Sequence, residues 1–462
     1  MAMDLAALYA HSPVWAQHVM CSIEGLRLRR QRFSADFDDR LAHARIRSTW
    51  TMAQLQSFRI ARLRAMLVHA QRNVPYWRDV FRAHGFEPAR LQHGDELAEL
   101  PLCDKDLVVR ESEGLRATAL PHGVSREPVL VHTSGTTGAG LSMPMSLEAL
   151  REQWAVCWRY RLWHGLRPGT WCATLGGRVI VRADETEPPF WRFNWPGRQV
   201  LLSGHHFGPS TARHYLQLLQ QHEIPWVHGY PSMVSALADA AAELDVRLPA
   251  LRFVTLASES VSERQRERIV AGLGVRPREH YAQTESVANI SECPRGRLHV
   301  DEDHAHVEFV PHGSEGGRTL YRVVGTSLDN WHQPLLRYDL GDLVTLAAHG
   351  CDCGLPGRVV EEIDGRREDL VELGDGRKVG RAGEIFKKLD FIREAQIRQR
   401  HAGEITIALV SRGPWTEAHD AKLRASVAER LGHAMRVTIT QVERLPRTAA
   451  GKLRHVVREG SD

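Results

Sequence analysis

From about residue 128 onward, short runs of β-branched and apolar residues alternate with stretches of helical spacing. The runs 128–131 and 171–175 have the length of buried strands, and residues 145–162 between them have the spacing of a helix. Alternation of this kind is typical of parallel sheets whose faces are covered by helices. The pattern therefore predicts an α/β fold.

The preceding part of the chain lacks such runs. Apolar residues there recur near helical spacing between Arg and Gln, as at Leu55, Phe58, Ile60, Leu63 and Leu67. We expect a helical preface over about residues 1–125.

A second unit is indicated near the C-terminus. Asp375-Gly376 stands between two candidate strands, 369–373 and 377–379, as in a type I′ turn. The remainder reads as a helix, a strand (404–410), a helix (416–431), a strand (435–441) and a polar tail. Because 462 residues exceed one core of ordinary size, we expect a large domain of sheets flanked by helices over 1–365 and a small α+β domain over 366–462.

The composition of the chain bears on whether it binds nucleic acids or membranes. The 60 basic and 56 acidic residues nearly balance, which gives no case for a nucleic acid, and the arginines at 27, 29, 30 and 32 are typical of a solvated helix face. No apolar run is long enough to span a bilayer, and the N-terminus lacks the pattern of a signal peptide. With seven cysteines, we expect a cytoplasmic protein with free or metal-bound thiols and no membrane partner.

A loop rich in glycine and hydroxyl groups follows the first apolar run. It reads Thr133-Ser134-Gly135-Thr136-Thr137-Gly138-Ala139-Gly140. Glycines let backbone N–H groups converge on oxygen atoms, and hydroxyls add donors with little bulk, so such loops suit phosphate. No Gly-Lys-Ser/Thr follows at Walker spacing, which disfavours an ordinary P-loop NTPase. Taken alone, the segment is also compatible with an ordinary glycine-rich turn.

Together with later motifs in the same order, this loop resembles that of the adenylate-forming enzymes, which include acyl-CoA synthetases, adenylation domains and luciferases. The segment Tyr281-Ala282-Gln283-Thr284-Glu285 is similar to the superfamily's Tyr-Gly-x-Thr-Glu. The resemblance implies that Tyr281 packs on adenine, Thr284 contacts the α-phosphate and Glu285 holds Mg²⁺. An aromatic face, a neutral hydroxyl and a hard oxygen ligand suit those roles.

Two further segments extend the resemblance. Residues 337–342 are similar to Tyr-x-Thr-Gly-Asp, which implies that Asp342 accepts hydrogen bonds from the ribose hydroxyls. Residues 365–369 are similar to the Gly-Arg-x-Asp hinge between a large and a small mobile domain. Arg366 is thereby assigned to the nucleotide, and Glu368 stands where the usual pivot is Asp or Lys.

The last motif lies close to the C-terminus. Residues 445–454 match the superfamily's Pro-Arg-Thr-x-x-Gly-Lys pattern, which implies that Lys452 is catalytic. A mobile cation between carboxylate and phosphate would stabilise the charge that accumulates at the α-phosphorus. On its own, the segment is also compatible with a solvated basic tail.

The resemblance is closest to the phenylacetate–CoA ligase branch, including relatives encoded with capsular polysaccharide genes, over about residues 50–460. The supporting segments are 226–232, 257–259, 290–293 and 296–299. It implies an adenine loop at Ala257, Ser258 and Glu259. Two departures are Ala139-Gly140, where Lys-Pro often follows the phosphate loop, and Ala282 in place of glycine.

We place the acyl pocket near His228, Tyr230 and Ala282. The Trp and His residues around this segment fit an aromatic acid, although aromatic residues at such density are more often core.

Cysteines suggest a metal site. Cys293, His299, Cys351 and Cys353 supply three thiols and an imidazole, enough for a closed structural zinc. The pairs lie far apart in sequence, so unrelated small residues near a turn are an open alternative. His304 and His306 are spare candidates.

The resemblance implies an enzyme that uses ATP, Mg²⁺ and coenzyme A. It activates a small carboxylic acid as its acyl-adenylate and transfers the acyl group after the small domain rotates about the residues near Glu368. An amine or a carrier protein as acceptor, and a catalytically silent scaffold of the same fold, are the alternatives. A homodimer is left open.

Overall fold

The structure is a computed structural model. It describes residues 5–34, 36–132, 141–182, 184–208, 210–315, 317–366, 370–375, 378–379, 382–386, 389–448 and 453–459. The chain forms two compact units. Unit 1 comprises residues 1–23, 170–278 and 364–462, and unit 2 comprises residues 24–169 and 279–363.

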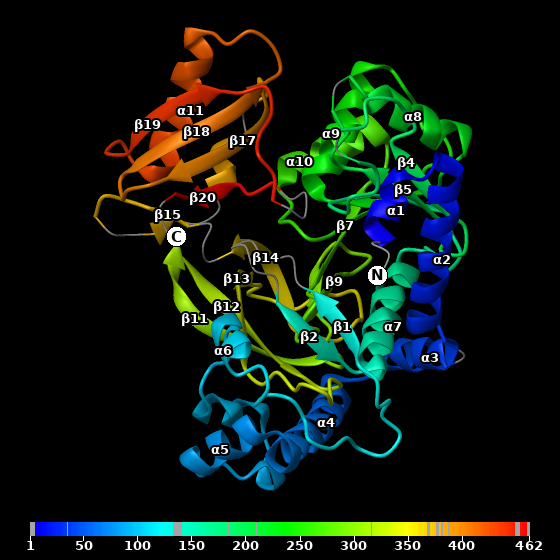
Figure 1. Ribbon diagram of the computed structural model, residues 1–462. Helices are drawn as coiled ribbons and strands as arrows, with labels where there is room; N and C mark the ends of the chain where they lie inside the picture. Colours follow the sequence, from blue (N-terminus) through cyan, green and yellow to red (C-terminus); the bar gives the residue numbers. More distant parts are fainter. Residues whose placement is uncertain are drawn as a thin grey trace. The chain divides into compact units, whose positions relative to one another are not determined.

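Unit 1 contains a largely parallel sheet in the order β7-β6-β3-β5-β4. Strands β3, β5, β6 and β7 are parallel, and β4 pairs antiparallel with β5. Helices α8, α9 and α10 lie beside this sheet (Figure 1). The bounds are β3 (Cys172–Gly176), β4 (Trp191–Asn194), β5 (Gln199–Ser203), α8 (Ala212–Gln221), β6 (Trp226–Gly229), α9 (Pro231–Glu243), β7 (Phe253–Leu256) and α10 (Glu263–Leu273).

Local sequence explains the limits of these helices. Proline at position 231 fixes the first turn of α9, where a missing N–H costs nothing. Helix α10 begins with a capping box between Ser262 and Gln265 and ends at Gly274, whose φ of 70° is left-handed. A side chain at Gly272 would collide with the carbonyl of Ala238, so this glycine allows α9 and α10 to pack closely.

The C-terminal part of unit 1 has its own sheet, ordered β19-β18-β17-β20, and its own apolar core. The bounds are η4 (Ala382–Phe386), β17 (Ile392–Gln399), β18 (Glu404–Ser411), α11 (Glu417–Leu431), β19 (Arg436–Gln441) and β20 (Val456–Arg458). These elements confirm the strand, helix and strand predicted from residue 404 onward. The helix predicted before residue 404 is wrong, because β17 lies there, and a shift of register near Ile392 disturbs the alternation that would have marked it as a strand. The predicted polar tail is also wrong in part, since it contains β20.

The predicted two-residue turn at Asp375-Gly376 is wrong. Strand β15 (Val371–Glu372) pairs with β16 (Lys378–Val379), and Glu372 lies opposite Lys378. This register does not fit a two-residue turn at 375–376, and Gly376 and Arg377 themselves lie outside the described residues.

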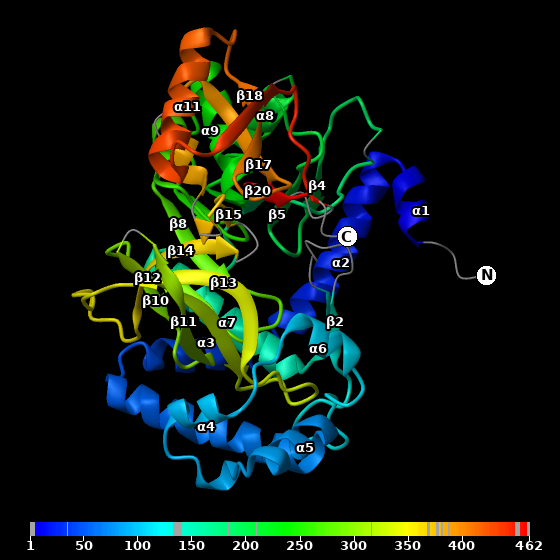
Figure 2. The same cartoon turned by 90° about the vertical axis from the view of Figure 1, so that its left-hand side faces the viewer.

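Unit 2 contains an antiparallel sheet in the order β11-β12-β13-β14-β10-β9-β8. The sheet's bounds are β8 (Pro277–Ala282), β9 (Asn289–Glu292), β10 (Leu298–Val300), β11 (Ala305–Glu315), β12 (Arg318–Ser327), β13 (Tyr338–Leu346) and β14 (Val359–Arg366). The helices are α3 (Phe37–Arg47), α4 (Met52–Asn73), α5 (Pro75–His84), η1 (Pro88–Arg90), η2 (Gly94–Glu99), α6 (Lys105–Arg110) and α7 (Leu147–Trp163). Helices α4 and α5 lie together at one end of this unit in both views (Figures 1 and 2).

The α/β class with helix-flanked sheets and the helical preface are confirmed, and two further helices, α1 (Leu5–His11) and α2 (Val14–Arg32), open the chain. One detail is wrong. The predicted strand at 128–131 does not join the parallel sheet, because β1 (Val129–His132) pairs antiparallel with β2 (Ser142–Met145). Strand β2 contains a proline, which made it unlike a strand in the sequence. Among the described helices, none has the length and apolar character needed to cross a bilayer.

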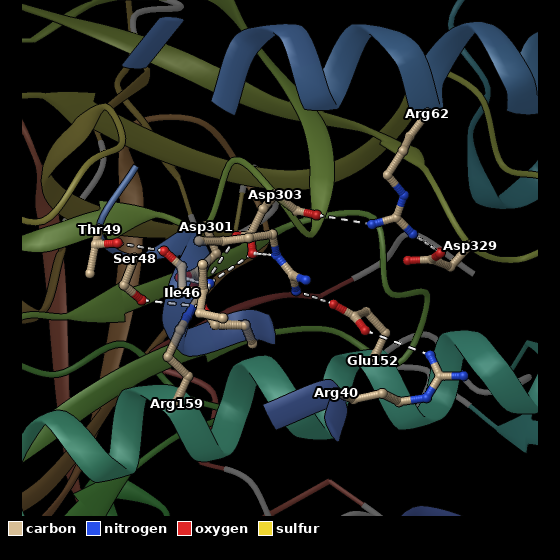
Figure 3. A network of polar contacts seen from close by, with 12 residues as sticks. Arg40, Ile46, Ser48, Thr49, Arg62, Glu152, Arg159, Asp301, Asp303 and Asp329 are labelled. Atoms are coloured by element: carbon tan, nitrogen blue, oxygen red, sulfur yellow. Dashed lines mark hydrogen bonds and ion pairs between the residues drawn. The ribbon is translucent and has the colours of Figure 1, made fainter. Parts of the chain in front are cut away.

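A network of buried charges holds unit 2 together (Figure 3). On α7, Arg159 donates to Asp301 at 2.6 Å and to Asp303 at 2.7 Å. On α3, Arg47 donates to Asp303 at 2.5 Å and also to Glu152. The network therefore ties two helices to the turn that precedes β11.

Burial sets the energetics of this network. Arg159, Asp301 and Asp303 are all at least 96% buried. Burial opposes ionisation of Asp303, but the guanidinium groups of Arg159 and Arg47 outweigh it and hold the pKa of Asp303 below its usual range. A buried ion pair adds little net stability, whereas removing one partner leaves a costly unpaired charge.

We therefore predict that Arg159→Met lowers the free energy of unfolding by about 3–5 kcal/mol, because Asp301 and Asp303 would lose their shared counter-ion. Urea unfolding followed by circular dichroism measures the change. The exposed Arg27 offers a control, since Arg27→Met should change stability by less than about 0.5 kcal/mol. Equal effects of the two substitutions would contradict this account of the network.

Candidate functional site

Tyr281 and Asp342 meet in the sheet of unit 2. Tyr281 lies on β8, and its hydroxyl donates to Oδ2 of Asp342 on β13 at 2.7 Å, across 61 residues of sequence. Asp342 is only 7% exposed. It follows Gly341, whose φ of 71° lies in the left-handed region. The structure thus brings together two motifs that the sequence separates.

The turn after β8 is held by α7. The carbonyl of Gln283 accepts from Nε2 of Gln153 at 2.9 Å and from the backbone N–H of Ser286 at 3.2 Å. Ser286 has a φ of 56°, which is uncommon for a residue with a side chain. Thr284 and Glu285 lie on this turn and are half-buried. This turn is therefore tied to α7 through Gln283 and closed by its own backbone hydrogen bond.

Several predicted site residues lie outside the described residues. They are Lys452, Glu368 and the whole loop of Thr133, Ser134, Gly135, Thr136, Thr137, Gly138, Ala139 and Gly140. Arg366 is described only as the last residue of β14. The flanks of the glycine loop are described, since His132 on β1 pairs with Ser142 on β2. These assignments therefore stay predictions.

In unit 1, other predicted residues gather where the parallel strands end. His228 is on β6, Tyr230 directly follows β6, and Ala257, Ser258 and Glu259 follow β7. Ligands of open α/β sheets bind outside the carboxyl ends of the strands. Ala282, the third residue predicted for the acyl pocket, is the exposed last residue of β8.

Hydrogen bonds fix the orientation of this carboxyl edge. Thr255 Oγ1 lies 2.9 Å from Nδ1 of His228 and accepts from Nε1 of Trp226 at 2.8 Å. Burial raises the pKa of Tyr230, so its hydroxyl stays neutral near pH 7. Ser258 has a φ of 74°, a left-handed backbone that marks a tight turn before Glu259.

A cavity of about 380 Å³ opens at the same edge. Gly176 ends β3, and Gly204 follows β5, so both belong to the carboxyl ends of the parallel strands. The lining residues are Gly176, Gly177, Gly204, His205, Met233, Arg444, Leu445, Pro446, Arg447 and Thr448. This cavity was not predicted from the sequence. The glycine pair after β3 was the available signal, since small residues at strand ends leave room for a ligand.

Cys293, His299, Cys351 and Cys353 converge in unit 2. One potential ligand atom from each lies within 4.8 Å of all the others. The sulfurs of Cys293 and Cys351 are 3.9 Å apart, too far for a disulfide and close to the separation of about 3.8 Å in a tetrahedral zinc site with Zn–S bonds near 2.3 Å.

The surroundings of this cluster suit a cation. Nδ1 of His299 lies 3.1 Å from the carbonyl of Pro356, and this hydrogen bond directs Nε2 toward Cys353 at 3.4 Å. Backbone N–H groups of Arg297 and Leu355 donate to the sulfurs of Cys293 and Cys353. The donor set therefore fits a closed, four-coordinate metal.

The two spare histidines do not join this cluster. Nε2 of His304 lies 3.2 Å from the Ser286 hydroxyl, and His306 packs beside Gly94. Burial lowers the pKa of His304 to about 4 and that of His306 to about 3, so both are neutral near pH 7.

Comparison with known proteins adds to this geometry. The C-terminal part, residues 374–459, matches the CapK C-terminal domain family. The chain is 22% identical to Protein CapK of Staphylococcus aureus, covering 97% of this chain and 98% of that protein. It is 23% identical to phenylacetate-coenzyme A ligase of Thermus thermophilus, covering 87% and 96%.

Solved structures share the fold. A crystal structure of 2-hydroxyisobutyryl-CoA ligase in the postadenylation state, in complex with 2-HIB-AMP, aligns with a TM-score of 0.68 and 18% identity. The alignment covers 89% of this chain and 91% of that one.

We predict that Tyr281→Phe lowers the free energy of unfolding by about 1–2 kcal/mol, because a mostly buried carboxylate loses a donor. Thermal unfolding measures the loss. Tyr321→Phe in the same sheet is the control, since the Tyr321 hydroxyl has no hydrogen-bond partner within the described ranges. An unchanged unfolding temperature for Tyr281→Phe would show that the hydrogen bond from the Tyr281 hydroxyl to Asp342 does not stabilise the fold.

Proposed function

We propose that this chain, which belongs to the phenylacetate–CoA ligase branch of the adenylate-forming superfamily, activates a carboxylic acid with ATP and transfers the acyl group to coenzyme A. The observation that carries the proposal is the meeting of Tyr281 and Asp342, the two motif residues assigned to adenine and ribose. Similarity to a phenylacetate–CoA ligase along 87% of the chain supports it.

In the first step, a carboxylate oxygen of the acid attacks the α-phosphorus of ATP, and pyrophosphate leaves. The loop Thr133–Gly138 and Thr284 would bind the phosphates, and Glu285 would hold Mg²⁺, which neutralises phosphate charge. Lys452 would stabilise the charge that accumulates between carboxylate and phosphate. Arg366 and the loop Ala257–Glu259 would complete the nucleotide site.

In the second step, the coenzyme A thiol attacks the acyl carbon, the carbon–oxygen bond to AMP breaks, and AMP leaves with that electron pair. The acid would lie at the carboxyl edge of the parallel sheet, near His228, Tyr230 and the 380 Å³ cavity. A cavity of this size suits a small acid, and the neighbouring rings of Tyr230 and His228 favour an aromatic one.

We further propose that the cysteine cluster holds a structural zinc. Cys293, Cys351, Cys353 and His299 would bind it, and a site with four protein ligands leaves no position for substrate. Zinc would link β10 to the segment 351–353. The free energy of metal binding would then add to the folding stability.

We predict that Lys452→Ala abolishes acid-dependent ATP–pyrophosphate exchange, by at least about 100-fold, while ATP binding and the unfolding midpoint stay near wild type. A panel of aryl and alkyl acids, beginning with phenylacetate, is assayed with both proteins. Lys422→Ala is the matched control, since Lys422 is exposed on α11.

Three results would contradict parts of this proposal. Undiminished exchange in Lys452→Ala would remove the role of Lys452. Thioester formation only with a carrier protein, or amide formation, would displace coenzyme A as the acceptor. Absence of exchange with every acid would favour a non-catalytic scaffold.

We predict about one zinc per purified chain, measured by plasma mass spectrometry, and loss of that zinc in Cys293→Ser. The unfolding temperature should fall with it. Cys157→Ser is the control, because Cys157 is also buried but lies outside the cluster. Wild-type protein without bound metal, after expression in zinc-supplemented medium, would rule out the zinc site.

A further inference from the structure

Glu259 bridges two backbone amides that come from distant parts of unit 1. Its Oε2 accepts from the backbone N–H of Ser232 at 3.1 Å, and its Oε1 accepts from the backbone N–H of Leu453 at 3.0 Å. Ser232 is in the first turn of α9, where backbone N–H groups lack partners within the helix. The helix dipole also favours a carboxylate at this end.

A second tie lies beside the first. Arg447 donates to the Ser232 hydroxyl at 3.2 Å and to Oε1 of Glu394 on β17 at 2.6 Å. The side chains of Arg447 and Glu394 are more than four-fifths buried. Both ties therefore end at Ser232, and together they hold residues 447 and 453 at the start of α9.

This docking places the flanks of the Lys452 segment. Leu453 directly follows Lys452, and its side chain is 6% exposed in a cluster with Ala408 and Leu445. The left-handed backbone at Ser258 turns the chain immediately before Glu259.

We propose that Glu259 and Arg447 are positioning residues, which dock residues 447 and 453 on the start of α9 so that Lys452 can act in adenylation. This inference rests on the proposed function. Each hydrogen bond to a charged group contributes about 1.5–3 kcal/mol, so these contacts are able to orient both flanks of Lys452.

The first measurement is hydrogen exchange at the Leu453 amide, followed by mass spectrometry on peptides that span residues 444–459. Wild-type protein should protect this amide, and Glu259→Ala should exchange it about 10- to 100-fold faster, because its acceptor is removed. Glu263→Ala is the matched control, since this acidic residue is four positions away and its side chain is exposed. Equal protection in all three proteins would overturn the docking.

The second measurement separates positioning from stability. With phenylacetate, or the fastest acid of the panel, we expect Glu259→Ala and Arg447→Met each to lower the kcat of pyrophosphate exchange about 10-fold or more. The rate of thioester formation from supplied acyl-AMP should stay near wild type, because this step forms no bond to phosphorus. The ratio of that rate to the rate of pyrophosphate exchange should therefore rise by the same factor. A purely structural role would lower both rates together and leave that ratio unchanged.

Glu259→Asp covers the case in which Glu259→Ala does not fold. It keeps the charge but shortens the reach by one methylene, so it should lose protection at Leu453 while retaining the fold. Wild-type protein that is inactive with every acid would remove the proposed function. An active wild type whose Glu259→Asp and Arg447→Met variants keep the wild-type ratio would overturn only the positioning roles.

Discussion

Asp342 is a carboxylate that the fold keeps almost entirely out of water, with a hydrogen bond from the hydroxyl of Tyr281. A buried carboxylate is costly unless donors surround it, so the sheet must bring Tyr281 on β8 to Asp342 on β13, although β14, β10 and β9 lie between them in the strand order. The glycine before Asp342 has a left-handed backbone, which glycine adopts without strain. The proposed ribose and adenine contacts depend on this one arrangement.

The strand next to β8 contributes to the stability of unit 2. Strand β9 presents Asn289 and Ser291, which donate to Asp301, and Asp301 accepts in turn from Arg159 on α7. Cys293 and His299 belong to the hairpin of β9 and β10. Buried charge at one end and the cysteine cluster at the other therefore restrict the strands next to Tyr281, which is how a rigid scaffold orients a site.

Much of the fold could be predicted because the spacing of apolar residues along the chain indicates which face of each element is buried. The helix predicted at 145–162 and the strand, helix and strand predicted from residue 404 onward have regular apolar spacing, and the structure confirms them. The helix predicted before residue 404 is wrong, because β17 lies there. Strand β2 was not predicted, because its proline and short length hide the alternation of a strand. Without β2, β1 was wrongly expected to join the parallel sheet. The connection near Asp375 was predicted to be shorter than the strand register allows, because turn residues do not specify the length of a loop.

The candidate site also has parts that the sequence predicted and parts that it did not. Residues whose side chains carry the chemistry, such as Tyr281 and Asp342, could be named from motifs, and the binding roles given to them stay predictions. The docking of Leu453 on Glu259 could not be named, because its donor is a backbone amide that any residue would supply. The cavity at the ends of the parallel strands was hidden for a related reason, since glycines contribute space and no functional group.

We propose that Tyr281 and Asp342 bind one nucleotide, and a crystal structure of the protein grown with AMP is the decisive test. Both ribose hydroxyls should lie within hydrogen-bond distance of the Asp342 carboxylate, and the adenine should lie against the ring of Tyr281. Electron density for AMP in a different cavity, with Asp342 bound only to Tyr281 and other protein groups, would contradict this proposal.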